Sequence, residues 1–429
     1  MSRVNAGLML LIALCAAAAR AQPQMPQWSV ALDDVQGPPA YVIGTGAGSD
    51  GIVVNLLRSG IGLTPLGLRR WRFTAAEVCA DGASNAHVDA VKPLPGGETW
   101  ALRSCYGPDG MPQQHQLLRL ASDGSPITTT DLGARPAQWG RAGLVPLPDG
   151  VIALVPGLGG LHWLRIGLDG QILGDAFTEL IGPPNASIRI LNAKRWPNGS
   201  VSVATHQFVS CNITPPTSCP RPASTLLRLS ADGTERWRVE AGERAAFIGF
   251  DDDGSSLIVQ SVFYEPLILR QVSANGVPGT PFVAAGGEPM SISGAAGPVR
   301  GRYLAHSETE QLLLDRDGTV LARRSQPDGI GGGAYACGTH GFITGVWYHD
   351  GALVSADDLS VLATFDVDGI DNTDWTSPGN LYWSLLDDGT IYTNSSRPGD
   401  LPSPRRARIS RFAVPGSPAA DLIFVDHLE

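Results

Sequence analysis

The chain has 429 residues, of which 43% are apolar and 17% are charged. This balance supplies apolar material for a core and excludes disorder across the whole chain. The formal net charge is −10 and no run of Lys and Arg occurs, so we expect no binding to nucleic acid. With 52 Gly and 33 Pro, the composition favours many short strands joined by turns over a helical bundle.

Residues 1–21 have the pattern of a secretory signal peptide. Arg3 precedes an apolar run over residues 8–19, and the segment Ala19-Arg20-Ala21 offers small residues for cleavage before Gln22. We therefore expect the mature protein to begin at Gln22.

The rest of the chain predicts one exported domain, residues 22–429. Arg outnumbers Lys 29 to 2, which suits a GC-rich bacterium. No segment after the leader has 18 uninterrupted apolar residues, so we expect no transmembrane segment. The predicted location is the periplasm or the medium, and lipidation at Cys15 is the alternative to a soluble mature chain.

Disulfides are the default expectation for cysteines in an oxidising compartment. Cys211 and Cys219 enclose a Pro-rich loop, and closing it removes entropy from the unfolded chain. Cys79 and Cys105 lie at the ends of two neighbouring predicted strands. We predict these two disulfides, with Cys337 left as a small buried thiol. A nucleophilic Cys337 is the alternative, and no C-x2-C spacing supports a metal site.

An apolar strand, a glycine-centred turn and a second apolar strand recur along the chain. Residues 144–155, with Asp149-Gly150 at their centre, are one example. Asn-Gly and Asp-Gly supply the positive φ that tight hairpin turns require. The eight repeat glycines are 43 to 55 residues apart: Gly51, Gly97, Gly150, Gly199, Gly254, Gly297, Gly341 and Gly389. This period predicts eight repeats.

A second strand, turn and strand follow about 20 to 35 residues later in several repeats. Its turn glycines are Gly124, Gly170, Gly233, Gly276 and Gly318. Each repeat is therefore two hairpins, which bury both their faces only when repeats stack around an axis. We predict an all-β fold, an eight-bladed β-propeller of four-stranded antiparallel blades. Seven blades is the alternative, if the first repeat is incomplete.

The predicted blades are 28–83, 87–133, 138–182, 188–242, 245–285, 289–326, 333–368 and 378–427. The seventh and eighth repeats match the second motif poorly. Closure of the ring stays open at this point. The segment Trp28–Leu32 could be the outer strand of the last blade, but Ala420–Val425 offers such a strand too.

The segment Leu226–Trp237, LLRLSADGTERW, resembles the strand-turn-strand signature of bacterial quinoprotein-like (PQQ-like) propellers, and more loosely that of other secreted repeat propellers. The resemblance covers almost the whole mature chain. Quinoprotein dehydrogenases add tryptophans at regular positions between blades and often a disulfide between adjacent cysteines. Here the ten Trp are irregularly spaced and no two cysteines are adjacent, which favours a non-catalytic relative of that family.

Three long insertions fall between second and third strands, at residues 106–115, 210–224 and 394–406. In a propeller these connections and those between blades emerge on one face, and the tight turns emerge on the other. Binding usually resides on long loops that a rigid scaffold positions. We therefore predict that a protein or glycan partner binds the long-loop face. Insertions without a function are the alternative.

Four carboxylates cluster near the predicted boundary of the seventh and eighth blades: Asp366, Asp368, Asp371 and Asp374. Closely spaced carboxylates can converge on one hard cation. The pattern predicts a calcium site on the long-loop face, and a solvated acidic turn is the alternative. No other cofactor is required.

No local catalytic motif is present in the sequence. There is no G-x-S-x-G, no H-E-x-x-H and no Walker-type loop. The first hypothesis is an exported, monomeric binding or scaffold module. The second is an enzyme, a lyase, hydrolase or quinone-dependent oxidoreductase, whose residues converge from several blades in the axial funnel.

Overall fold

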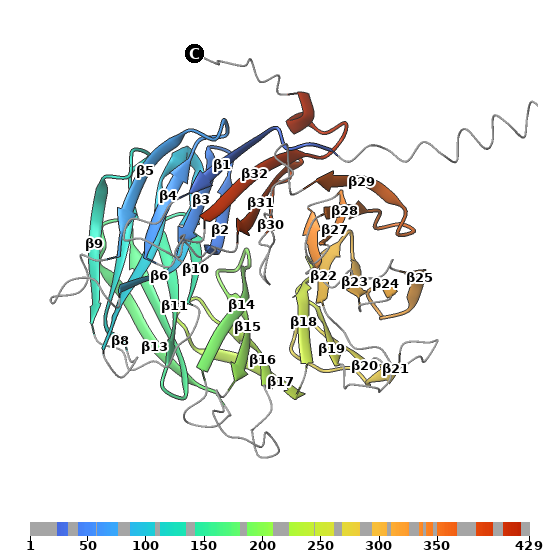
Figure 1. Cartoon of the computed structure of the whole chain (residues 1–429). Coiled ribbons are helices and arrows are strands. Elements are labelled where there is room, and N and C mark those ends of the chain that lie inside the picture. Colours follow the sequence, from blue (N-terminus) through green and yellow to red (C-terminus); the bar gives the residue numbers. More distant parts are fainter. Residues whose placement is uncertain are drawn as a thin grey trace, which may run out of the picture.

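Each repeat folds as a four-stranded antiparallel sheet, and eight such sheets, the blades, follow one another around a ring (Figure 1). The computed structural model describes residues 24–32, 42–56, 58–75, 86–107, 112–133, 142–180, 187–208, 223–243, 245–260, 268–283, 294–306, 310–325, 334–337, 340–345, 350–366, 383–397 and 406–421. The predicted eight-bladed, all-β propeller is confirmed.

The first four blades have these bounds. Blade 1 comprises β2 (Val42–Gly48), β3 (Gly51–Leu56), β4 (Ser59–Leu63) and β5 (Arg69–Thr74). Blade 2 comprises β6 (Ala86–Pro93), β7 (Thr99–Tyr106), β8 (Pro112–Leu120) and β9 (Pro126–Gly133). Blade 3 comprises β10 (Gly143–Leu147), β11 (Gly150–Gly157), β12 (Gly160–Gly167) and β13 (Ile172–Glu179). Blade 4 comprises β14 (Ser187–Arg195), β15 (Val201–Phe208), β16 (Ala223–Leu229) and β17 (Glu235–Glu243).

The other four blades follow in chain order. Blade 5 comprises β18 (Ala245–Phe250), β19 (Ser256–Gln260), β20 (Ile268–Val272) and β21 (Phe282–Val283). Blade 6 comprises β22 (Gly294–Val299), β23 (Arg302–His306), β24 (Glu310–Leu314) and β25 (Val320–Ser325). Blade 7 comprises β26 (Ala334–Cys337), β27 (Gly341–Gly345), β28 (Asp350–Val354) and β29 (Val361–Asp366). Blade 8 comprises β30 (Trp383–Leu385), β31 (Thr390–Arg397), β32 (Arg406–Ala413) and β1 (Trp28–Leu32).

Helical structure in these ranges is limited to two short 3-10 turns, η2 (Pro95–Gly97) and η5 (Pro418–Asp421). Neither has the length or the apolar character that a bilayer span requires.

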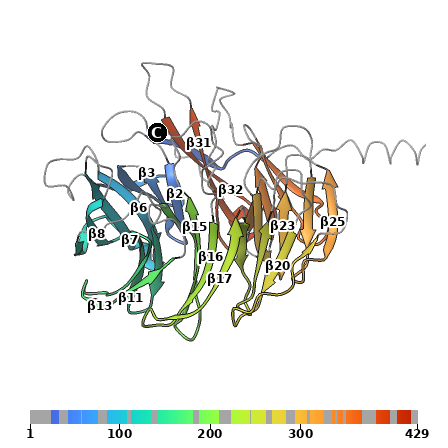
Figure 2. The same ribbon diagram turned by 90° about the horizontal axis from the view of Figure 1, so that it is seen from below.

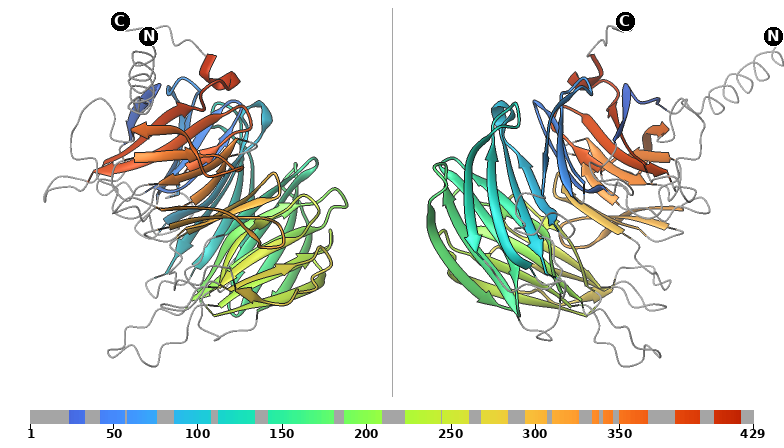
Figure 3. Two further views of the ribbon diagram at one scale, coloured as in Figure 1. Left: turned by 90° about the vertical axis from the view of Figure 1, so that its right-hand side faces the viewer. Right: turned by 60° about the vertical axis from the view of Figure 1, so that its left-hand side comes forward.

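The N-terminal strand closes the ring. β1 pairs antiparallel with β32, with Trp28 opposite Arg411, and the blue N-terminal strand lies beside the red C-terminal strands in Figure 3. Gln24, just before β1, forms a parallel bridge with Phe365 of β29. The predicted start of blade 1 at residue 28 is therefore wrong, because that segment belongs to blade 8. The other proposed closing strand was residues 420–425. Ala420 and Asp421 belong to the 3-10 turn η5, and residues 422–425 lie outside the described ranges.

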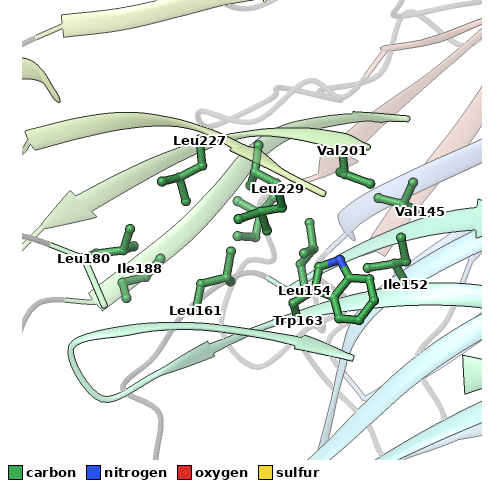
Figure 4. Packing of buried hydrophobic residues seen from close by; sticks show 12 residues of the cluster. Val145, Ile152, Leu154, Leu161, Trp163, Leu180, Ile188, Val201, Leu227 and Leu229 are labelled. Atoms are coloured by element: carbon green, nitrogen blue, oxygen red, sulfur yellow. The ribbon is translucent and has the colours of Figure 1, made fainter. Parts of the chain in front are cut away.

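A hydrophobic cluster fills each of the eight interfaces between blades. The first strands of successive blades contact one another around the axis, and β30 contacts β2. In Figure 4, Leu161 and Trp163 of blade 3 lie opposite Ile188 and Leu227 of blade 4. The eight clusters link blades 1–2, 2–3, 3–4, 4–5, 5–6, 6–7, 7–8 and 8–1. Burial of both faces of every blade thus depends on the closed ring.

The turn glycines explain the period of the repeat, and two turns, in blades 6 and 7, depart from it. All eight predicted repeat glycines have positive φ, but Gly297 lies inside β22, and the blade 6 turn is Arg300–Gly301, four residues further on. In blade 7 the positive φ of the second turn falls on Leu359, at 62°, whose buried side chain packs in the core. Blade 8 has no second turn because its outer strand comes from the N-terminus.

Tryptophans dock neighbouring blades together. Trp71 on β5 packs against Gly124 in the β8–β9 turn of blade 2, where a Cβ would lie 2.4 Å from the Cβ of Trp71. Trp237 and Trp28 meet Gly276 and Gly67 of the next blades in the same way. The tryptophans that are irregularly spaced along the sequence therefore occupy equivalent positions on three outer strands.

Blade 3 achieves the same contact by an exchange between strands. The position equivalent to Trp71 is Gly174, and Trp163 of the adjacent strand β12 fills the space that Gly174 leaves, 3.0 Å from where its Cβ would be. Trp163 then packs against Gly233 of blade 4. Trp163 thus fills the space at Gly174 in its own blade and also docks against blade 4. The tryptophan is therefore missing from its usual place in the sequence repeat, although the contact between the blades is kept.

Ion pairs join successive blades on the face that carries the short turns. Arg316 of blade 6 contacts Asp251 at 2.7 Å and Asp253 at 2.9 Å, both in blade 5. The Asp251 side chain is 3% exposed. Lys194 of blade 4 contacts Asp252 at 2.9 Å, but Asp252 is 99% exposed. The Arg316–Asp251 pair and the Lys194–Asp252 pair therefore differ mainly in the burial of the carboxylate.

We expect R316M to lower the free energy of unfolding by about 1–2 kcal/mol, because it leaves the buried Asp251 carboxylate without its cation. D252N should change the free energy of unfolding by less than about 0.5 kcal/mol, because an exposed pair contributes little. Urea unfolding of both variants measures the difference. Equal effects would show that burial of Asp251 is irrelevant.

Candidate functional site

The two faces of the ring carry different connections. Turns between first and second strands and between third and fourth strands lie on one face, here called the tight-turn face, whose described turns gather along the lower edge of Figure 2. In eight of these turns an Asp or Asn side chain accepts a hydrogen bond from the N–H group two residues later: Asp123, Asp169, Asn198, Asp232, Asp253, Asp317, Asp358 and Asp388. The opposite face is the long-loop face.

The three predicted insertions do connect second to third strands. They join β7 to β8, β15 to β16 and β31 to β32. Their central residues, 108–111, 209–222 and 398–405, lie outside the described ranges, and the strands that flank them are described. The base of each long connection is therefore the part of the long-loop face that the structure describes.

Most residues of the predicted disulfides and calcium site lie outside the described ranges. Among the predicted disulfide cysteines, Cys105 on β7 is described; it is disulfide-bonded, and its pairing with Cys79 stays a prediction. Cys211 and Cys219, like Cys79, fall outside.

Of the four predicted calcium ligands, Asp366 is described. It ends β29 at the boundary of blades 7 and 8, and its N–H group donates to the Gln24 carbonyl at 3.0 Å. Asp368, Asp371 and Asp374 fall outside the described ranges. Within those ranges, no group of three or more His, Cys, Asp or Glu side chains could hold a metal ion.

A polar cluster lies in blade 2 at the base of the first long connection. Asp89 is the extra residue of a β-bulge in β6, a device that redirects a side chain. The hydroxyl of Ser104 on β7 hydrogen-bonds Asp89 Oδ2 and lies 2.5 Å from Nδ1 of His115 on β8. The Tyr106 hydroxyl donates to Asp89 Oδ1 at 3.0 Å, and the His87 ring packs on the Tyr106 ring. We call these five residues the Asp89 cluster.

Burial shifts the pKa values of three groups in the Asp89 cluster: His87, Asp89 and Tyr106. Burial raises the pKa of Asp89 to about 6, against the opposing effect of the hydrogen bonds from Ser104 and Tyr106. Burial, and then the charge of Arg58, lower the pKa of His87. Burial and the Asp89 charge hold the pKa of Tyr106 far above its ordinary value. Tyr106 is therefore a neutral donor, and Asp89 is a carboxyl group whose pKa is raised to about 6.

The hydroxyl of Ser104 couples the carboxyl to the imidazole. It has one proton, so when it donates to ionised Asp89 it must accept from the Nδ1–H group of His115. Protonation of Asp89 allows the hydroxyl to donate to His115 instead. In a hydrolytic triad the imidazole stands between carboxylate and hydroxyl, whereas here the hydroxyl is central and fully buried. The arrangement suits proton transfer at Asp89, rather than nucleophilic attack by Ser104.

Blade 4 repeats part of this arrangement at the same register. Ser104 and His115 are opposite each other on β7 and β8, and His206 and Ser224 are opposite each other on β15 and β16. His206 Nδ1 lies 3.0 Å from the Ser224 hydroxyl, and burial and then the charge of Arg189 lower the pKa of His206.

The Asp89 cluster was not predictable from a local sequence motif. Its members come from three strands, and the pairing register brings them together. The bulge at Asp89 has no sequence signature of its own. One signal was available, since Tyr106 and His115 are the two ends of the insertion that the sequence predicts, residues 106–115, although both lie within strands β7 and β8 in the structure.

No protein-family model matches the sequence, and no curated protein matches it. Solved structures match the fold. The propeller of Dos1 is similar with a TM-score of 0.58 at 11% identity, over 90% of this chain and 94% of that one. Quinohemoprotein alcohol dehydrogenase from Comamonas testosteroni has a TM-score of 0.53 at 11% identity, over 91% of this chain and 76% of that one.

BamB from Moraxella catarrhalis is a third match, with a TM-score of 0.51 at 11% identity over 90% of this chain and 97% of that one. At this level of identity the likeness concerns the fold. It confirms that the repeats resemble quinoprotein-like propellers. The same fold serves a dehydrogenase and proteins whose names state no reaction, so function has to be argued from the site.

Proposed function

We propose that this chain is an exported propeller that binds a protein or glycan partner through its long-loop face. The observation that supports the proposal is the asymmetry between the two faces. Asp and Asn side chains close the turns of the tight-turn face, and ion pairs tie its blades together. The longest connections all leave from the opposite face, above the His–Ser pairs of blades 2 and 4.

Site-specific photo-crosslinking of the full chain tests the proposal in its native cell envelope. A crosslinking residue at Asp109 or Thr217 samples the long-loop face, and one at Asp123 or Asp232 samples the tight-turn face. An array of bacterial surface glycans, probed with the same purified proteins, covers a glycan partner.

We expect adducts of discrete mass, or glycan binding that a bulky crosslinker at Asp109 or Thr217 weakens. Adducts confined to Asp123 and Asp232 would overturn the proposal. The absence of both adducts and glycan binding would overturn it too, and would leave the second candidate.

The second candidate is an enzyme whose acid–base group is Asp89. The observation that favours it is the raised pKa of Asp89, on one of the innermost strands and close to a hydroxyl and an imidazole. Assays with p-nitrophenyl esters, p-nitrophenyl glycosides and acidic polysaccharides test it. D89N should abolish any turnover that the matched turn variant D232N retains. If wild type turns over none of these substrates, or if D89N retains the activity, this candidate fails.

We also propose that Asp366, Asp368, Asp371 and Asp374 bind calcium at the boundary of blades 7 and 8. Calcium that binds the folded state alone raises its stability by mass action. We expect 5 mM calcium to raise the melting temperature by a few degrees, and D371N with D374N to remove that rise. Melting curves that superimpose with calcium and with a chelator would refute the site.

A further inference from the structure

Blade 3 carries two stacked rings at a position where the other blades carry none. His162 on β12 lies opposite Phe177 on β13, and the ring centroids are 4.7 Å apart. We call these two residues the ring pair. Phe177 is 46% exposed, and it is the one exposed aromatic residue among the side chains whose exposure the structure describes.

The equivalent row of third and fourth strands is mostly polar in the other blades. Blade 5 has an aliphatic pair, Ile268 and Val283, and blade 8 has Ala31 opposite Arg408. The remaining pairs are Ser59 and Thr74, Gln116 and Asp131, Thr225 and Glu240, Glu310 and Ser325, and Asp350 and Asp366. The ring pair is therefore particular to blade 3 and is not part of the repeat.

Two glycines make room for the rings. Gly157 ends β11 and Gly160 begins β12. A Cβ at Gly157 would lie 2.8 Å from Cδ2 of His162, and a Cβ at Gly160 would lie 2.5 Å from Cζ of Phe177. The rings thus lie over bare backbone at the long-loop end of blade 3. Only two residues separate these glycines, whereas residues 107–111 and 209–222 join the same strands in blades 2 and 4.

Carboxylates flank Phe177 along β13. Ala176 packs in the cluster between blades 3 and 4, and alternate residues of a strand share a face, so Asp175, Phe177 and Glu179 face blade 2. All three are exposed, and successive members are about 7 Å apart. The strand therefore presents an apolar ring between two acceptor groups, and His162 adds an imidazole beside the ring.

This side of blade 3 faces the Asp89 cluster. His162 shares a face of β12 with Leu164, and Ser104 shares a face of β7 with Leu102. Leu164 and Leu102 belong to the core cluster between blades 2 and 3. The ring pair and the Asp89 cluster thus lie on facing sides of one interface, both at its long-loop end. A ligand on the ring pair is bound beside the first long connection.

The chemistry of the row fits a sugar better than a protein. A pyranose has an apolar C–H face, which packs on an aromatic ring, and hydroxyls at its edge, which donate to carboxylates. A stable protein interface buries about 1,200–2,000 Å² of surface around a cluster of apolar anchors. Phe177 is a single exposed ring between two carboxylates, which suits a ligand the size of a few sugars.

The charge of the row selects among sugars. Arg238 of blade 4 donates to the Glu179 carbonyl at 2.5 Å, but it forms its ion pair with Glu235. The Asp175 and Glu179 side chains therefore face solvent as two like charges, which repel an anionic glycan. A neutral sugar or an amino sugar meets no such repulsion.

We propose that the ring pair stacks against a neutral sugar or an amino sugar of a glycan, with Asp175 and Glu179 accepting hydrogen bonds from its polar groups. The inference rests on the proposed binding function and narrows it to one class of partner and one place on the long-loop face.

Calorimetry of the mature full chain with defined tetrasaccharides tests the proposal. The probes are cellotetraose, maltotetraose, mannotetraose, the chitosan tetramer and, as the anionic sugar, tetragalacturonate. We expect wild type to bind at least one neutral or amino sugar, and F177L, which keeps an apolar cover over Gly160 without a ring, to raise its dissociation constant at least tenfold. F177W should retain binding. L173A is the matched control, because Leu173 is 58% exposed on the same face of β13, and it should leave the dissociation constant unchanged. These positions are exposed, so the variants should keep the wild-type melting temperature.

The outcomes separate this inference from the proposed function. Equal binding by F177L and wild type would overturn the site, while the sugar could still occupy another part of the long-loop face. Protein adducts at Asp109 or Thr217 without binding of any tetrasaccharide would overturn it in favour of a protein partner. Tighter binding of tetragalacturonate than of every other probe would also overturn it. The absence of both adducts and sugar binding would overturn the proposed function as well.

Discussion

G124A should destabilise the propeller by about 2–5 kcal/mol in the free energy of unfolding. Two costs combine. Gly124 has φ of 82°, which costs an L residue about 1–2 kcal/mol. The added Cβ would lie 2.4 Å from the Cβ of Trp71 and 2.6 Å from its Cγ, and overpacking of this kind costs about 1–3 kcal/mol or more. Trp71 belongs to the core cluster between blades 1 and 2. The Trp71 side chain therefore cannot move away from the added methyl group without disrupting the packing between these blades.

A matched control is available in the same blade. Gly133 has φ of 73°, but nothing lies within 4 Å of the position of its Cβ. G133A should therefore cost only the backbone term, about 1–2 kcal/mol. The free energies of unfolding of the two variants are measured in urea. The difference between them gives the cost of disturbing the contact between Gly124 and Trp71. G276A, whose Cβ would lie 2.5 Å from Trp237, should behave like G124A. Equal losses in G124A and G133A would refute blade docking by tryptophan.

Local turn chemistry made most of the fold predictable from the sequence. An Asp-Gly or Asn-Gly turn needs positive φ whatever surrounds it, so Gly150 or Gly199 marks a hairpin without knowledge of the fold. The predictions failed at two places where contacts between distant parts of the chain, rather than local turn chemistry, determine the structure. Leu359 adopts positive φ because its side chain is held in the core, and Trp28 belongs to blade 8 because the ring closes there. Neither fact is encoded within its own repeat.

The candidate site was not predictable in the same way. A catalytic or binding motif is recognisable when its residues are close in sequence or have a fixed spacing. Asp89, Ser104 and His115 are joined by the register of two hairpins, and the bulge that aims Asp89 shifts that register by one residue. The tryptophan contacts were hidden for a related reason, since the role of Trp71 passes in blade 3 to Trp163 on a different strand. What the sequence did locate was the insertion whose ends are Tyr106 and His115.

D89N should stabilise the protein near neutral pH and remove part of its pH dependence. The folded state raises the pKa of Asp89 from 3.8 to about 6, so between these values the folded state binds more protons than the unfolded state. Wild-type stability therefore falls as pH rises from about 4 to 6, and the loss is complete above about 6.5. With a discount because Asp89 is partly accessible, this loss amounts to about 2–3 kcal/mol. An amide carries no charge and avoids it.

The informative quantity is the free energy of unfolding of D89N minus that of wild type, measured in urea from pH 4 to pH 8. It should rise by about 2 kcal/mol across this range, and taking the difference cancels the opposite contribution of His87, which both proteins contain. D232N is the control, because hydrogen bonds from Ser230 and Thr234 lower the pKa of Asp232 to about 2, and its effect on stability is then fully developed above pH 4. A constant difference for D89N would mean that Asp89 ionises without penalty. A rising difference would mean that the fold retains at position 89 a carboxylate that lowers its stability, which is the behaviour expected of a residue kept for function.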